Sequence, residues 1–137
     1  MDPRSDESAT GRTADLYAEI TEQFGMVPNF FRAQAETDPA WFELNWRRWK
    51  LIMGSQRALD RKTKELIAVA VSIVNNCEYC TLAHEASALM VGASEQEIAE
   101  MKQVVELFAS FTKIADALKV PCDVTPEMVR TTRAAPT

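Results

Sequence analysis

Apolar residues in this chain recur three or four positions apart in almost every segment that contains them, which is the spacing of helix faces. No segment alternates apolar and polar residues as a half-buried strand does. The pattern predicts an all-α fold, a helical bundle of about six helices. The segments predicted as helices are 14–24, 30–36, 39–53, 61–74, 77–91 and 95–120.

Residues that begin or end helices stand at the edges of these segments. Thr13 is placed to cap the first helix, and Asp38 followed by proline is a strong start for the third. Asp60 opens the fourth, and Ser94 with Glu97 forms a capping box before the longest one. Residues that stop helices follow the segments: Gly25, Gly54, Gly92 and Pro121.

The stretch 66–74 is apolar on nearly all sides, which is typical of a buried helix. Asn75 and Asn76 then break the helix, so we expect a central buried hairpin formed by 61–74 and 77–91. The aromatic-rich helix 39–53 is interpreted as core or subunit interface. The surplus of apolar faces in so small a chain indicates a homo-oligomer.

The 137 residues are 47% apolar and 26% charged, as expected for one folded domain. We predict a flexible tail at 1–12, the helical domain at 13–122, and a final turn with a frayed end at 123–137. The net charge of −5 disfavours a nucleic-acid partner. No apolar signal segment is visible and no apolar run is long enough to cross a bilayer, so we expect a cytoplasmic protein without a membrane partner.

The segment 77–84 has the pattern Cys-x-x-Cys-x-x-x-His and includes the single histidine of the chain. On a helix, Cys77, Cys80 and His84 share one face. If the helix begins after Asn76, its free N–H groups and dipole favour a thiolate. His84 leans back toward Cys80, so Cys80 is the thiol best placed for activation, and Cys77 is the partner that closes the disulfide.

Glu65 lies on the helix before the thiols and shares a polar stripe with Ser72 and Asn76. A buried carboxylate requires a partner, and His84 is available if the two helices form a hairpin. Counted along the helix axes, Glu65 lies about 16 Å from the break and His84 about 10 Å. We therefore expect that a bridging water is needed between them.

The ordered set Glu65, Cys77, Cys80 and His84 resembles the signature of the AhpD-like alkylhydroperoxidases in the carboxymuconolactone decarboxylase superfamily. A softer likeness extends upstream to the segment 25–29 and covers most of residues 14–120. Superfamily decarboxylases lack the cysteine pair, so the likeness is to the peroxidase branch. Well-known members have a histidine between the cysteines, where this chain has Tyr79.

The resemblance implies an all-helical, AhpD-like subunit that assembles into trimers or hexamers. It implies that Cys80 attacks a hydroperoxide, that Cys77 closes the disulfide, and that Glu65 and His84 relay protons. A dithiol such as a lipoylated protein is then the expected reductant. The resemblance implies no cofactor and no metal.

Two alternatives remain open at this level. Cys77, Cys80 and His84 have ligand types that suit zinc, with Cys122 as the fourth ligand. The chain can instead be a non-catalytic helical oligomer whose dithiol acts as a redox sensor or partner-binding switch.

Overall fold

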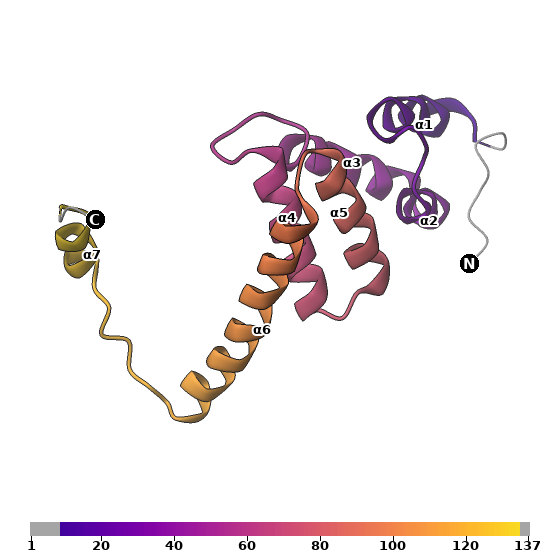
Figure 1. Ribbon diagram of the computed structural model, residues 1–137. Helices are drawn as coiled ribbons and strands as arrows, with labels where there is room; N and C mark the ends of the chain where they lie inside the picture. The colour runs from indigo at the N-terminus through magenta and orange to yellow at the C-terminus, as the bar shows by residue number, and fades with distance from the viewer. Residues whose placement is uncertain (1–8, 135–137) are drawn as a thin grey trace. The chain divides into compact units, whose positions relative to one another are not determined.

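The computed structural model describes residues 9–134, and every regular element in this range is a helix (Figure 1). The all-α prediction is therefore confirmed. The described residues hold one helix more than expected, because the residues after Thr125 form a nine-residue helix instead of a single turn. The rest of the predicted tails, residues 1–8 and 135–137, lies outside the described range. The helices are α1 (Gly11–Phe24), α2 (Asn29–Thr37), α3 (Pro39–Ile52), α4 (Arg61–Val74), α5 (Glu78–Met90), α6 (Glu95–Ala117) and α7 (Pro126–Ala134).

The chain divides into two compact units, an N-terminal unit that ends at Lys64 and a C-terminal unit that begins at Glu65. In the N-terminal unit, α3 packs against α1 and α2. Phe42 and Trp46 of α3 are fully buried, and Trp46 stacks on Trp49 with ring centroids 5.1 Å apart. The aromatic-rich helix thus supplies core residues, as predicted. The remaining buried core residues of this unit are Leu16, Tyr17, Ile20, Val27, Phe31 and Ala35.

The first helix begins earlier than the sequence predicts. Thr13 is not its N-cap but is buried within the helix, which starts at Gly11 with a φ of 57°. Arg12 donates through Nη2 to Oε1 of Glu43 on α3 at 2.8 Å, which fastens the first turn of α1 to its neighbour. The N-cap residue is Thr10, whose side chain makes no capping hydrogen bond.

The other predicted helix starts are confirmed by their capping hydrogen bonds. Oδ1 of Asp60 accepts from the backbone N–H of Thr63 at 2.7 Å, and Oγ of Ser94 accepts from that of Glu97 at 3.0 Å. Asp38 caps α3 in the same way. Each bond satisfies a donor that the first helical turn leaves free.

Helices α4 and α5 form the expected hairpin, and the chain breaks at Asn75–Asn76 as predicted (Figure 1). Asn76 takes a left-handed φ of 58°, a conformation that asparagine tolerates better than most residues. The first turns of α6 return to the hairpin, where Glu85 of α5 pairs with Lys102 of α6 at 2.6 Å. The small core at this junction comprises Ala88, Ala93 and Ile98, with Leu66 and Met101 packed against it.

The hairpin is not buried on all sides, which corrects the sequence prediction. Glu65, Val69 and Ser72 of α4 are buried, but Val71 on the opposite side is 53% exposed. Within residues 9–134, the neighbours of α4 therefore cover only the face that carries Glu65, Val69 and Ser72, although the helix is apolar on nearly all sides. The other exposed apolar side chains of the hairpin are Ile67, Val74, Leu82, Leu89 and Met90.

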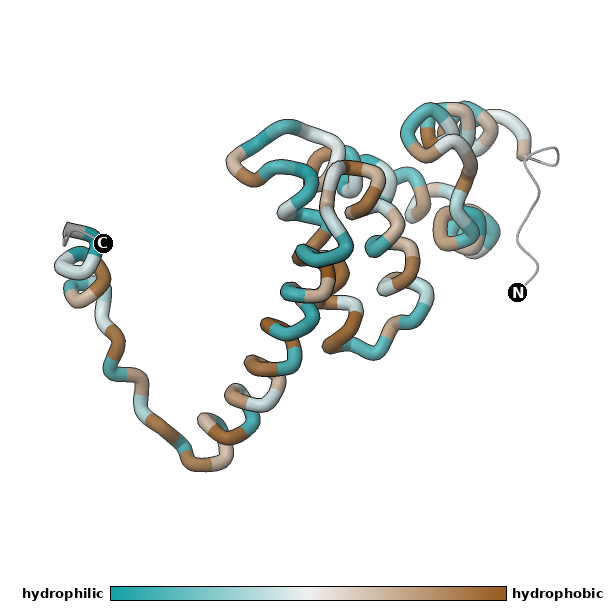
Figure 2. The backbone as a smooth tube through the Cα atoms, viewed as in Figure 1, coloured by the Kyte–Doolittle hydropathy of each residue, from teal (hydrophilic) through white to brown (hydrophobic). Residues whose placement is uncertain are grey.

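The second half of α6 extends beyond the hairpin (Figure 1), and every residue from 106 to 117 is exposed. Apolar residues nevertheless recur along this half (Figure 2). Within the described residues, no helix combines the length and apolar character needed to cross a bilayer.

Candidate active site

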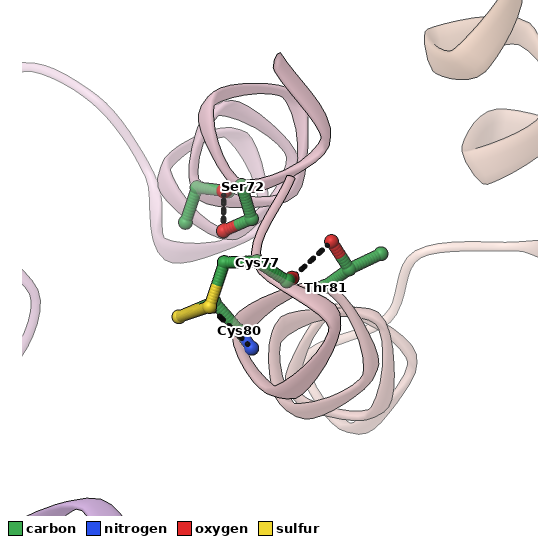
Figure 3. The surroundings of a disulfide bond; sticks show 5 residues. Ser72, Cys77, Cys80 and Thr81 are labelled. Atoms are coloured by element: carbon green, nitrogen blue, oxygen red, sulfur yellow. Dashed lines mark hydrogen bonds between the residues drawn. A yellow bond between two sulfur atoms is a disulfide. The ribbon is translucent and has the colours of Figure 1, made fainter. Parts of the chain in front are cut away.

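The two cysteines of the motif lie at the start of α5. Cys77 and Cys80 form a disulfide, with their Cα atoms 5.3 Å apart (Figure 3). Both residues are half-buried. A pair that is bonded in one state and reachable from solvent can alternate between a disulfide and two thiols.

Cys77 is the N-cap residue of α5, and Cys80 lies in the first turn. Sγ of Cys77 accepts a hydrogen bond from the backbone N–H of Cys80 at 3.2 Å. Free N–H groups and the helix dipole favour negative charge at this position, so a thiolate is stabilised here once the disulfide is reduced. This agrees with the predicted location of the thiols at a helix start.

Two hydrogen bonds fix the backbone of Cys77. Its N–H donates to the carbonyl oxygen of Ser72 at 2.9 Å, and Oγ1 of Thr81 donates to its carbonyl oxygen at 2.8 Å (Figure 3). Sequence reasoning gave Thr81 no role. The available signal was local, since a threonine four residues after a cap residue can bond back to its carbonyl.

Glu65 and His84 are joined directly. Oε2 of Glu65 lies 2.7 Å from Nδ1 of His84, and the Glu65 side chain is only 1% exposed while that of His84 is 30% exposed. An ionised carboxylate only accepts hydrogen bonds, so Nδ1 carries the proton and donates it. In the neutral form of the ring, this tautomer leaves the lone pair on Nε2, where an imidazole can accept a proton.

The direct contact corrects the expectation of a bridging water. In the folded hairpin, Glu65 is nine residues from the end of α4 and His84 is six residues into α5. The remaining axial offset is about 5 Å at the helical rise per residue. The two side chains span this offset.

His84 follows Cys80 by four residues on the same uninterrupted helix, so the two side chains occupy one face of α5. The hairpin thus brings Glu65 to His84 and carries Cys80 one turn before the histidine. Glu65 and Ser72 share the buried face of α4 as predicted, and Oγ of Ser72 donates to the carbonyl oxygen of Ala68 at 2.7 Å. Asn76 lies beyond the end of α4 and is exposed.

The zinc alternative requires a fourth ligand beside the motif. Cys122 is exposed, and its Sγ is 3.8 Å from the carbonyl oxygen of Val124. Among residues 9–134, no group of three or more histidine, cysteine or acidic side chains is arranged to hold a metal ion. Tyr79, between the cysteines, is 45% exposed.

Together, the fold and the site define an AhpD-like protein: an all-α chain with a Cys-x-x-Cys pair at a helix start and a buried glutamate bonded to a histidine. The model of the carboxymuconolactone decarboxylase family matches residues 35–121, a range that includes all four candidate residues. The chain therefore belongs to the carboxymuconolactone decarboxylase family.

Two relatives each match about half of this chain. The chain is 38% identical over 69 residues to uncharacterized protein 4 in the cox locus of Paracoccus denitrificans. It is 30% identical over 66 residues to the alkyl hydroperoxide reductase AhpD of Corynebacterium kroppenstedtii. These matches cover 50% and 48% of this chain but only 58% and 36% of the two relatives.

A solved structure shows the same fold. The alkylhydroperoxidase AhpD core from Rhodospirillum rubrum superposes with a TM-score of 0.76 at 32% sequence identity. The superposition covers 80% of this chain and 82% of that one.

Proposed function

We propose that this chain is a thiol-dependent peroxidase of the alkylhydroperoxidase type. The observation that carries the proposal is the 2.7 Å hydrogen bond between Glu65 and His84, on the same hairpin as the Cys77–Cys80 disulfide. A buried carboxylate that orients an imidazole, one helical turn from a thiol, is the arrangement needed to activate that thiol. The names of the Corynebacterium kroppenstedtii and Rhodospirillum rubrum relatives support the same activity.

The proposed reaction begins with the reduced pair. His84 takes the proton of the Cys80 thiol, and the thiolate attacks the terminal oxygen of a hydroperoxide. An S–O bond forms, the O–O bond breaks, and the proton held on His84 passes to the departing alkoxide to give an alcohol. Cys80 is left as a sulfenic acid.

The second step closes the disulfide. The Cys77 thiol loses its proton, its thiolate attacks the sulfur of the Cys80 sulfenic acid, the S–S bond forms and the S–O bond breaks, and the departing hydroxide takes up that proton and leaves as water. The N-cap position of Cys77 favours its thiolate form in this step. A dithiol donor, such as a lipoylated protein, then reduces the disulfide by two exchange steps and becomes a disulfide itself. Such a donor requires a reducing compartment, and we propose the cytoplasm.

A non-catalytic redox sensor is less well supported. That alternative drew on the poor reach between Glu65 and His84, and the direct bond removes this difficulty. A sensor has no need of an oriented base beside its thiols. We also propose that the working protein is a homo-oligomer, because many apolar side chains of the C-terminal unit are exposed in one chain.

Hydroperoxide consumption by the pure protein, with dihydrolipoamide as the reductant, tests the function. We expect Cys80→Ser to abolish turnover, because no other thiol lies one turn before His84 on α5. We expect Cys77→Ser to accumulate a sulfenic acid on Cys80, which dimedone labels and mass spectrometry detects. Cys122→Ser is the matched control and should leave turnover unchanged. Full turnover by the Cys80→Ser protein would refute the assignment.

A further inference from the structure

A groove between α2 and α3 lies wholly within the N-terminal unit and has no part in the proposed reaction. Its volume is about 670 Å³, within the range of small-molecule sites. Most of its wall is apolar, including side chains that are half exposed, such as Phe30 and Trp41. The other apolar side chains that form its wall include Trp49, Ile52 and Met53.

Three polar side chains of this wall form a directed chain of hydrogen bonds. Nη1 of Arg48 donates to Oδ1 of Asn45 at 3.3 Å, and Nδ2 of Asn45 donates to Oε1 of Gln34 at 3.0 Å. Arginine can only donate, so it fixes the orientation of the first amide, and that amide fixes the second. Nε2 of Gln34 is left as the terminal donor of the chain.

Gln34 is only 5% exposed, yet it is one of the residues that line the groove. Within residues 9–134, its Nε2 donates to no protein group, and this atom is not sealed from solvent. An amide nitrogen that is open to a groove donates to whatever enters it, a ligand or water. Because the chain starts at a cation, each bond polarises the next and strengthens the terminal donor.

We infer that this groove binds an elongated apolar carboxylate, with its hydrocarbon body on the aromatic wall and its carboxylate on Gln34 Nε2 and the Arg48 guanidinium. Charge complementarity supports an anion, because Arg48 is the single charged residue of the wall and no carboxylate lines the groove. This is a binding site additional to the thiol site.

A helix of a second copy fits the groove less well. The backbone acceptors of a helix are already used within the helix, so its apolar face offers nothing to the Gln34 amide. The carboxylate of the proposed ligand supplies this acceptor. Its hydrocarbon body covers the aromatic rings that are exposed in the groove.

Calorimetric titration of the intact protein with decanoate, and separately with decan-1-ol, tests the inference. Both probes carry the same hydrocarbon chain, and only decanoate carries the charge. We expect decanoate to bind about tenfold more tightly, as a charge-assisted hydrogen bond predicts. Tryptophan fluorescence should shift on binding, because Trp41 and Trp49 line the groove.

Arg48→Gln should reduce this preference to about twofold or less, since it removes the cation at the start of the chain. Arg47→Gln removes the same charge from the neighbouring position, which does not line the groove, and should keep the preference. Both side chains are exposed, so folding is not at risk. Equal affinity for the two probes, equal effects of the two substitutions, or no binding at all would each overturn the inference. None of these results depends on peroxide turnover.

Discussion

At the scale of single residues, the burial of Glu65 governs the chemistry of the site. A carboxylate that is 1% exposed loses its hydration, and donors in the protein must replace the lost water. His84 provides one such donor through Nδ1. The same bond orients the ring, and in the proposed reaction Nε2 accepts the proton, so we expect stability and turnover to depend on different nitrogens of one side chain.

Two substitutions of His84 separate these effects. In His84→Asn, the amide nitrogen lies near the position of Nδ1 and still donates to Glu65, whereas His84→Ala removes the donor. We expect His84→Ala to lower the free energy of unfolding by about 1–3 kcal/mol, and His84→Asn by less than half of that. Both should reduce peroxide turnover by about a hundredfold, because both lose the base.

Denaturant unfolding and steady-state turnover measure the two effects separately. If His84→Asn is as destabilising as His84→Ala, the hydrogen bond to Glu65 does not stabilise the fold. If the His84→Asn protein turns over hydroperoxide at the original rate, Nε2 is not the base.

At the scale of helices, the cap at the start of α4 makes stability sensitive to acid. The hydrogen bonds from Thr63 hold the pKa of Asp60 below its usual value. A carboxyl whose pKa is lower in the folded state stabilises the fold above its unfolded pKa, near pH 4, and loses this contribution as the pH falls through the folded value. We expect the free energy of unfolding to decrease with acidification in that range.

Asp60→Asn provides the comparison, since asparagine caps helices almost as well as aspartate but carries no titrating charge. Chemical denaturation from pH 7 down to pH 2 should show a shallower loss of stability for this variant than for the original protein. Parallel pH profiles would show that the Asp60 charge does not contribute.

The helix boundaries show what the sequence could predict. Asp60 and Ser94 bond to backbone groups three residues away, so a short stretch of sequence contains both partners. The thiol motif was predictable for the same reason, because its geometry follows from one continuous helix. The start of α1 was mispredicted at Thr13, because Thr13 is buried within the helix and the actual N-cap, Thr10, makes no side-chain capping hydrogen bond.

Contacts between helices account for the rest. The contact between Glu65 and His84 was expected. Whether the two side chains bond directly depends on how closely α4 and α5 pack, and the spacing of residues along the sequence does not determine that distance. The chain from Arg48 to Gln34 joins α3 to α2 and has no local sequence signal. The outward face of the hairpin was predicted to be buried, yet its apolar side chains are exposed in the part of the chain that the structure describes.

At the scale of the whole molecule, the second half of α6 exposes a row of apolar side chains to solvent. Five apolar residues between 104 and 118, within this half and at its two ends, alternate spacings of three and four, as do the a and d positions of a coiled coil. All are 44% exposed or more. An isolated helix of this length is marginal in water, so we expect this half to be ordered by packing against another copy of the chain. These residues are Val104, Leu107, Phe111, Ile114 and Leu118.

A charge at the centre of this stripe tests the assembly. Phe111→Lys should weaken association at least about tenfold, because the ammonium group must be desolvated at the interface. Thr112→Lys adds the same charge one position away, off the stripe, and should leave the assembly intact. Sedimentation equilibrium measures the mass of each variant, and hydrogen exchange should accelerate in the second half of α6 only when subunits separate. An original protein that is monomeric at every concentration, or a Phe111→Lys protein of unchanged mass, would show that this stripe does not join subunits.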